Sequence, residues 1–163
     1  MADRHRGQRP FRAVVRPATI RPFSPEDAAD CVALFESAWN LGHAYAPRRI
    51  GLEEFRAETE GEAIFVAELP AGHVAGFVSI YPSEQFIHHL YVAPDHLRRG
   101  IGRALFAAAV SALGGTASLK CQTRNPGAVA FYLRLGLIPA DRGESAVGPW
   151  VRMVLPSEER AAR

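Results

Sequence analysis

The chain has 163 residues, of which 48% are hydrophobic and 22% are charged, a composition that excludes a chain disordered throughout. Its longest purely apolar run, Ala104–Val110, is far shorter than the roughly 20 residues of a membrane-spanning helix, and no apolar stretch follows the N-terminus as in a signal peptide. We therefore expect a cytoplasmic protein with no membrane partner.

The net charge of +2 is unevenly distributed along the chain. Residues 1–16 hold five arginines and one acid, a local charge of +4, which leaves −2 for the remainder. Nucleic-acid-binding domains carry basic residues along a groove rather than in a tail. We expect a flexible basic tail over 1–16, one domain over 17–163, and no nucleic-acid ligand.

The two cysteines, Cys31 and Cys121, lie far apart and lack CxxC spacing. This excludes a disulfide framework and a cysteine-based zinc site. We expect both to be small core residues, and we expect no metal.

The first half of the chain predicts three strands and two helices. Ser24 and Pro25 are an N-cap and a first-turn proline, and apolar residues then recur at helical spacing as far as Trp39. A hairpin follows a second short helix. The expected elements are a strand over 18–22, helices over 24–39 and 52–60, and strands over 63–68 and 74–81.

The second half predicts a strand–helix–strand crossover followed by a helix and a last pair of strands. A crossover of this length makes its two strands parallel. The fold class is therefore α/β, with a mixed, mostly antiparallel central sheet, one parallel βαβ unit and helices on both faces. The expected elements are a strand over 86–93, a helix over 100–114, a strand over 118–123, a helix over 125–136, and strands over 137–140 and 150–155.

The turn before the helix over 100–114 reads LRRGIGR, from Leu97 to Arg103. Its glycines allow a tight turn, and the first free amides of the helix offer a phosphate site at the positive end of the helix dipole. The turn lacks the third glycine of a dinucleotide motif and the lysine of a P-loop. A turn that merely connects strand to helix is the alternative. The candidate phosphate-binding residues are Arg98, Arg99, Gly100, Ile101, Gly102 and Arg103.

Three segments, IHHLYVAP (87–94), RRGIGRAL (98–105) and NPGAVAFYLRLGL (125–137), together resemble the GCN5-related N-acetyltransferase (GNAT) family. Members of this family transfer an acetyl group from acetyl-CoA to an amine. The resemblance covers about residues 18–155 and implies the GNAT fold, with acetyl-CoA as co-substrate.

The resemblance also implies roles for individual residues. The pyrophosphate of coenzyme A falls on residues 98–103, and the pantetheine arm lies along the main chain of the strand before them. Tyr132 matches the acid that protonates the departing thiolate. Leu97 departs from the usual Gln or Arg, and Lys120 stands where members that acetylate protein N-termini carry a glutamate. The other implied cofactor contacts are Leu90, Tyr91, Val92 and Asn125.

Attack by an amine needs a base, because amines are largely protonated at neutral pH. His88 and His89 point to opposite faces if the strand alternates regularly, with His88 beside Leu90 and Val92. His88 lies where relatives often carry the base, and an imidazole suits the task. The alternative is one core and one exposed histidine. Glu84 is a second candidate, acting through a water, and Tyr132 has core packing as its alternative.

The acceptor pocket is expected between the segment after the first helix and the last hairpin. Four residues there could hold an amine by cation–π contact, although such residues are more often core. Nearby acids, Glu36, Glu53 and Glu54, are expected to be solvated. Cys121 is expected to be buried rather than a nucleophilic relay. The four candidate substrate-binding residues are Trp39, His43, Tyr45 and Trp150.

The leading hypothesis is an N-acetyltransferase that transfers an acetyl group from acetyl-CoA to a primary amine of a small molecule, by direct attack in a ternary complex. The alternatives are a non-catalytic acyl-CoA-binding module and an enzyme acting on a peptide or protein amine. A homodimer that pairs through the last hairpin also stays open.

Overall fold

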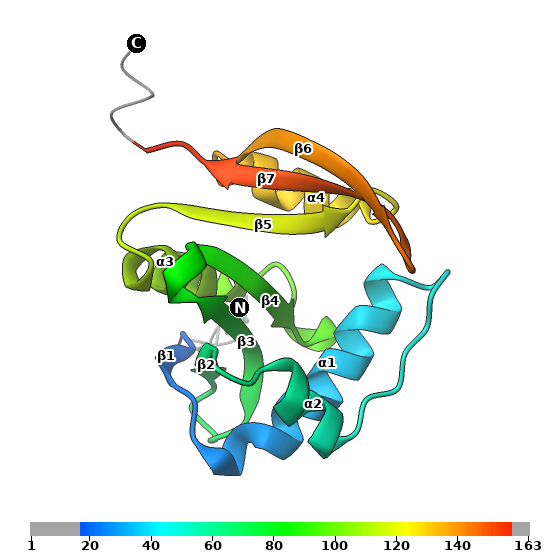
Figure 1. Cartoon of the computed structure of the whole chain (residues 1–163). Helices are drawn as coiled ribbons and strands as arrows, with labels where there is room; N and C mark the ends of the chain where they lie inside the picture. Colours follow the sequence, from blue (N-terminus) through cyan, green and yellow to red (C-terminus); the bar gives the residue numbers. More distant parts are fainter. Residues whose placement is uncertain (1–16, 158–163) are drawn as a thin grey trace, which may run out of the picture.

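The computed structural model describes residues 17–157, so the predicted basic tail over 1–16 lies outside the described residues. A seven-stranded sheet runs in the order β1-β2-β3-β4-β5-β7-β6 (Figure 1). Its strands are β1 (Thr19–Pro22), β2 (Ala63–Glu68), β3 (Val74–Tyr81), β4 (Phe86–Val92), β5 (Ala117–Gln122), β6 (Ile138–Ser145) and β7 (Gly148–Leu155).

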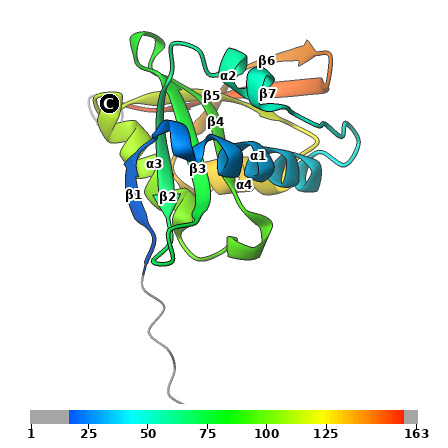
Figure 2. The same cartoon turned by 90° about the horizontal axis from the view of Figure 1, so that it is seen from below.

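Helices cover both faces of this sheet (Figures 1 and 2). On one face α1 and α2 enclose a core with Phe35, Phe55 and Phe77. On the other face α3 and α4 enclose a core that includes Leu105 and Tyr132. The helices are α1 (Ala28–Gly42), α2 (Leu52–Glu58), α3 (Ile101–Ala112) and α4 (Pro126–Arg134), with short 3-10 helices at Pro25–Asp27, Pro82–Glu84 and Pro94–His96. No helix within residues 17–157 is long and apolar enough to cross a bilayer.

The predicted parallel pair is confirmed, and it is unusual in being very short. All other neighbouring strands run antiparallel, whereas β4 and β5 are parallel and share one pair in the described chain, Phe86 with Ser118. Beyond that pair the two strands separate towards their carboxyl ends (Figure 1). The β5-facing edge of β4 past this pair therefore has backbone groups available to a ligand.

A glycine in β3 brings α3 close to the sheet. A Cβ built on Gly76 would lie 2.9 Å from both the Leu105 Cδ1 atom and the Tyr91 carbonyl oxygen. Real Cβ atoms do not approach a backbone oxygen so closely, so this position needs glycine. Gly76 thus sets the distance between β4 and the N-terminal half of α3.

The expected alternation of side chains along β4 is wrong at the two histidines. The register of β3 with β4 shifts by one residue, so that Ile80 pairs with Ile87 while Ser79 pairs with His89. This is a β-bulge, in which two residues of one strand oppose one of the other. His88 is the extra residue and is exposed, while His89 is buried on the α1 face.

Several boundaries also differ from the sequence expectation, and the start of α1 and the end of β6 differ most. The segment Pro25–Asp27 is a 3-10 turn, and α1 begins after it at Ala28. Strand β6 continues to Ser145, five residues beyond the predicted end, although nearly all of it is exposed. An edge strand exposed along its length has no alternating apolar pattern, so the sequence does not reveal it.

Candidate active site

The predicted phosphate-binding turn has the backbone conformation that its sequence suggested. Arg98 and Gly100 adopt positive φ angles of 59° and 82°, and Gly100 is the N-cap of α3. No side chain caps this helix, so the amides of its first residues, Ile101, Gly102 and Arg103, keep free hydrogens.

The turn is also positively charged and accessible. Arg98, Arg99 and Arg103 are exposed, and none forms an ion pair with a residue in 17–157. A Cβ on Gly102 would lie 3.2 Å from the ring of Phe131, so α4 packs directly against the start of α3. Free amides, the helix dipole and three guanidinium groups without an acidic partner in 17–157 make this turn a good candidate for an anion site.

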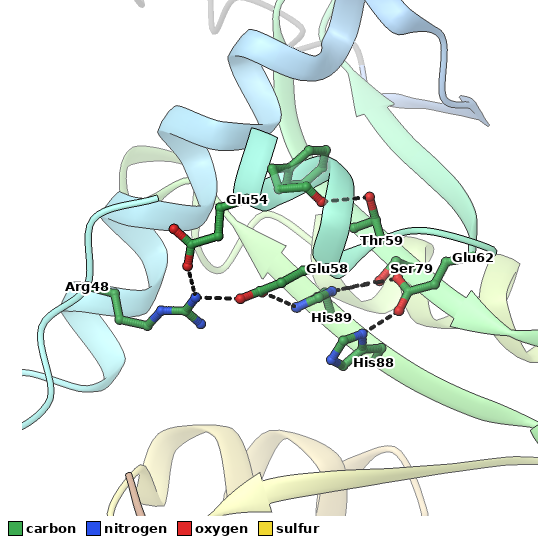
Figure 3. Close-up of polar contacts among 9 residues, drawn as sticks. Arg48, Glu54, Glu58, Thr59, Glu62, Ser79, His88 and His89 are labelled. Atoms are coloured by element: carbon green, nitrogen blue, oxygen red, sulfur yellow. Dashed lines mark hydrogen bonds and ion pairs between the residues drawn. The ribbon is translucent and has the colours of Figure 1, made fainter. Parts of the chain in front are cut away.

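His88 has a buried acidic partner that the sequence did not reveal. Its Nδ1 is hydrogen-bonded to Glu62, which immediately precedes β2 and whose side chain is 0% exposed (Figure 3). Burial raises the pKa of Glu62, but contacts with His88 and His89 outweigh it and lower the pKa to about 2. Glu62 is therefore a carboxylate that accepts a hydrogen bond from His88.

His89 belongs to the same group of side chains. Its Nδ1 is 2.9 Å from the Ser79 hydroxyl, and its Nε2 is 3.6 Å from Glu58. Burial lowers the pKa of His89, but Glu58 and Glu62 raise it by more, so the net shift is upward. Arg48 extends the group by donating to Glu54 at 2.7 Å and to Glu58 at 2.5 Å (Figure 3).

Tyr132 and Cys121 lie on the α3 face of the sheet, beside the separated strands. Burial raises the pKa of Tyr132, and Cys121 and Tyr91 add to this shift, so its hydroxyl stays protonated at neutral pH. Burial also raises the pKa of Cys121, to about 11. Such a thiol is a poor nucleophile, which agrees with the expectation that Cys121 is a buried residue.

Asn125 performs a structural task. Its Oδ1 accepts a hydrogen bond from the Ala128 amide at 3.2 Å and so caps α4. Its Nδ2 lies against Gly42 at the end of α1, where a Cβ would come within 2.6 Å. These contacts account for the residue without a ligand.

Glu84 is exposed in the Pro82–Glu84 turn and forms no ion pair within 17–157.

The rings predicted to bind the substrate amine already have cationic neighbours within the chain. Arg48 lies 5.5 Å from the Trp39 ring, Arg124 lies 5.3 Å from Tyr45, and Lys120 lies 4.3 Å from Trp150. Three of the four rings proposed to hold a substrate cation thus already face a cation of the chain itself.

The remaining contacts of these residues are also internal. The Trp39 Nε1–H donates to the Ala46 carbonyl at 2.7 Å, and buried His43 stacks on Trp39 at 3.9 Å between ring centroids. Trp150 lies over Gly143, where a Cβ would meet its ring at 2.3 Å. Trp39, His43 and Trp150 thus have packing partners within the chain, whereas Tyr45 is 39% exposed.

A comparison with models of known protein families matches residues 28–137 to the acetyltransferase (GNAT) family. The chain belongs to the GNAT family. It is therefore an acyltransferase enzyme, and the match spans α1 to the end of α4, including the phosphate-binding turn and both histidines. A search of curated proteins found no match.

Solved structures agree with this GNAT assignment at the level of the fold. A GCN5-related N-acetyltransferase from Rhodopseudomonas palustris has a TM-score of 0.73 at 23% identity, covering 88% of this chain and 98% of that one. A phosphinothricin acetyltransferase from Sinorhizobium meliloti, in complex with AcCoA, has a TM-score of 0.71 at 18% identity, covering 91% and 92%. The ribosomal-protein-S18-alanine N-acetyltransferase from Escherichia coli has 0.67 at 23%, covering 85% and 93%.

Proposed function

We propose that this GNAT enzyme transfers an acetyl group from acetyl-CoA to a primary amine of a small molecule, by direct attack in a ternary complex. The observation that carries the proposal is the separation of β4 from β5 directly beside the uncapped start of α3. The pyrophosphate binds the free amides of the turn, and the pantetheine arm takes the place of a strand along Leu90, Tyr91 and Val92. The thioester then lies where β4 and β5 converge, near His88.

His88 is the general base in this proposal. Because Glu62 is bonded to Nδ1, the proton of the neutral ring sits on Nδ1 and the lone pair is on Nε2. His88 is 36% exposed at its side chain, so Nε2 is accessible to an acceptor. Glu62 stabilises the imidazolium that forms, as the carboxylate does in other acid–histidine pairs. Glu84 remains a weaker candidate, because nothing orients it.

Two side chains of the protein, His88 and Tyr132, move protons in the proposed reaction. The acceptor first loses its ammonium proton to solvent; the lone pair of the neutral amine then attacks the thioester carbon, and His88 Nε2 accepts the second proton that the nitrogen loses. The tetrahedral intermediate collapses with cleavage of the C–S bond, and Tyr132 donates its proton to the departing sulfur. The products are an amide and free coenzyme A.

A small cationic acceptor suits the charges around His88. Glu54, Glu58 and Glu62 contribute three carboxylates, against which the group holds one arginine, Arg48. Opposite charge raises the local concentration of a protonated amine. The aromatic rings, being occupied internally, are not needed for this attraction.

The test measures release of coenzyme A with a thiol reagent, using acetyl-CoA and a panel of small primary amines and of peptides with free N-termini or lysines. Cys31 and Cys121 are both buried, so the protein contributes little background. We expect a higher kcat/KM for a small diamine or polyamine than for any peptide. Preference for a peptide would favour the protein-acetylating alternative, and tight acetyl-CoA binding without release would favour the non-catalytic module.

A matched pair of variants tests the phosphate-binding turn. Arg103→Gln removes one charged hydrogen bond and should weaken acetyl-CoA binding by about 10–100-fold, since such bonds contribute about 1.5–3 kcal/mol. Arg134→Gln removes a charge that is also exposed but lies at the C-terminal end of α4, away from the turn, and it should leave the calorimetric Kd for acetyl-CoA unchanged. Equal effects of the two variants would contradict this site.

A further inference from the structure

Glu62, His88 and His89 form a compact cluster of metal-binding groups. One ligand atom from each residue lies within 4.8 Å of the others. The shift of register in β4 brings this about, because it places both histidines beside the same carboxylate (Figure 3). Without the bulge, adjacent histidines would face opposite sides of the sheet.

The cluster contains a buried oxygen with no partner. Glu62 binds His88 through Oε1, but its Oε2 makes no hydrogen bond within the described chain although the side chain is 0% exposed. Nδ1 of His89 lies 3.8 Å from it, beyond hydrogen-bonding distance. Leaving such a group unsatisfied is costly, and an unseen ion is one of the few explanations.

The surroundings of His89 resemble the outer shell of a metal site. A histidine that binds a metal through one nitrogen usually donates its other N–H to a carboxylate. Glu58 lies 3.6 Å from His89 Nε2 and is itself held by Arg48 at 2.5 Å. With Nε2 facing Glu58, Nδ1 of His89 lies 2.9 Å from the Ser79 hydroxyl and 3.8 Å from Oε2 of Glu62, beside the carboxylate that would share the ion.

We propose that Glu62, His88 and His89 bind one transition-metal ion of the Zn²⁺ type, through one carboxylate oxygen and two imidazole nitrogens. Two histidines and a glutamate are a common zinc ligand set, with a fourth position open to water. Ca²⁺ and Mg²⁺ are disfavoured, because they prefer sites built from oxygen ligands. No cysteine takes part, and the three ligands come from two separate segments, which explains why the sequence showed no metal motif.

The three ligand atoms lie within 4.8 Å of one another and must move closer together to bind one ion. Three atoms bound tetrahedrally to one Zn²⁺ at about 2.1 Å lie about 3.4 Å apart, against the 3.8 Å between Glu62 Oε2 and His89 Nδ1. His88 has an exposed side chain that can rotate, and the Ser79 hydroxyl, now 2.9 Å from His89 Nδ1, can turn away.

The ion would inhibit acetyl transfer, and this consequence rests on the proposed function. When the Nδ1 of a neutral imidazole binds a metal, the ring proton must sit on Nε2. His88 would then have no lone pair to accept the proton of the amine. Zn²⁺ and catalysis therefore compete for one side chain.

The first experiment measures metal binding without any enzymatic reaction. ZnCl₂ is titrated calorimetrically into the full chain, with no affinity tag, and Co²⁺ absorption reports tetrahedral geometry. We expect one ion per chain, and at least 10-fold weaker binding in both Glu62→Gln and His88→Gln. Glu58→Gln should weaken binding by about 10–100-fold through loss of the outer-shell contact. The matched controls Glu60→Gln and His96→Gln alter groups outside the cluster and should bind Zn²⁺ like the native chain.

The outcomes separate this inference from the proposed function. No saturable binding in millimolar Zn²⁺, or unchanged affinity in His88→Gln, overturns the metal site; the latter variant alters an exposed side chain and should fold. A chain that binds Zn²⁺ at the cluster but transfers no acetyl group supports the site and overturns the proposed function. Native enzyme that is inhibited by Zn²⁺ and restored by a chelator, together with weakened Zn²⁺ binding in Glu62→Gln, supports both.

Discussion

Replacing Tyr132 by phenylalanine removes one oxygen atom from the proposed site and little else. The ring is 9% exposed and packs in the core between α4 and the sheet. Its hydroxyl makes no hydrogen bond to another residue in 17–157, so its loss leaves no buried partner unsatisfied. Stability should therefore change by less than about 1 kcal/mol.

The effect on turnover should be far larger. General acid catalysis contributes about 10²–10⁴-fold, equivalent to about 2.7–5.4 kcal/mol of transition-state stabilisation. Because burial raises the pKa of Tyr132, the native hydroxyl is protonated over the whole working range of pH and available as an acid. The loss should appear in kcat, since the phenol acts on the departing sulfur and not on bound acetyl-CoA.

The assay combines initial rates of coenzyme A release, calorimetric Kd for acetyl-CoA and thermal unfolding. We expect kcat to fall at least 100-fold, by the lower estimate for acid catalysis, while Kd and Tm stay close to the native values. An unchanged kcat would remove Tyr132 from the mechanism. A parallel loss of kcat, binding and Tm would assign it a packing role instead.

Three further changes test other parts of the structure. Gly76→Ala should destabilise the chain by about 1–3 kcal/mol in chemical unfolding, because the new methyl group meets a backbone oxygen, whereas Gly127→Ala in α4 has room and should not destabilise. Cys121→Ala should retain acetyl transfer, and a loss of the acyl-enzyme burst together with turnover would instead reveal a cysteine relay. Arg21 donates two hydrogen bonds to Asp27 and holds its pKa below the usual value, so Asp27→Asn should be less stable than the native chain at pH 7. That difference should begin to shrink near pH 4, where the carboxyl of the unfolded chain takes up its proton, and should disappear only below the lowered pKa of the native carboxyl; a constant difference down to that pH would contradict the assignment.

The sequence predicted those elements whose signals are local. The hairpin β2–β3, the helix α3 and the turn before it all depend on residues that are neighbours in the chain, so periodicity and glycine spacing revealed them. The last strands depend on the sheet instead: β6 is exposed along its length, and its pairing with β7 decides its extent. No pattern within residues 138–145 contains that information.

The same limit applies to the candidate site. His88 was predicted, but Glu62 was not, because it lies 26 residues earlier in the chain and meets His88 through the pairing of three strands. The internal partners of the predicted substrate-binding rings were missed for a related reason. Trp39 and Trp150 are typical cation-binding residues, but Arg48 and Lys120, which occupy their faces, are brought there by the fold. Composition shows which rings can bind a cation but not which cation reaches them.

The bulge in β4 links these observations into one design. Regular pairing would place one histidine beside Glu62 and turn the other towards α3, giving a base with a partner but no cluster. The extra residue instead exposes His88 at the point where β4 and β5 converge while His89 stays buried against Glu58. His88 can reach an acceptor because the bulge takes it out of the regular alternation of the strand. The buried carboxylate of Glu62 that holds it is also the group that a metal ion would bind.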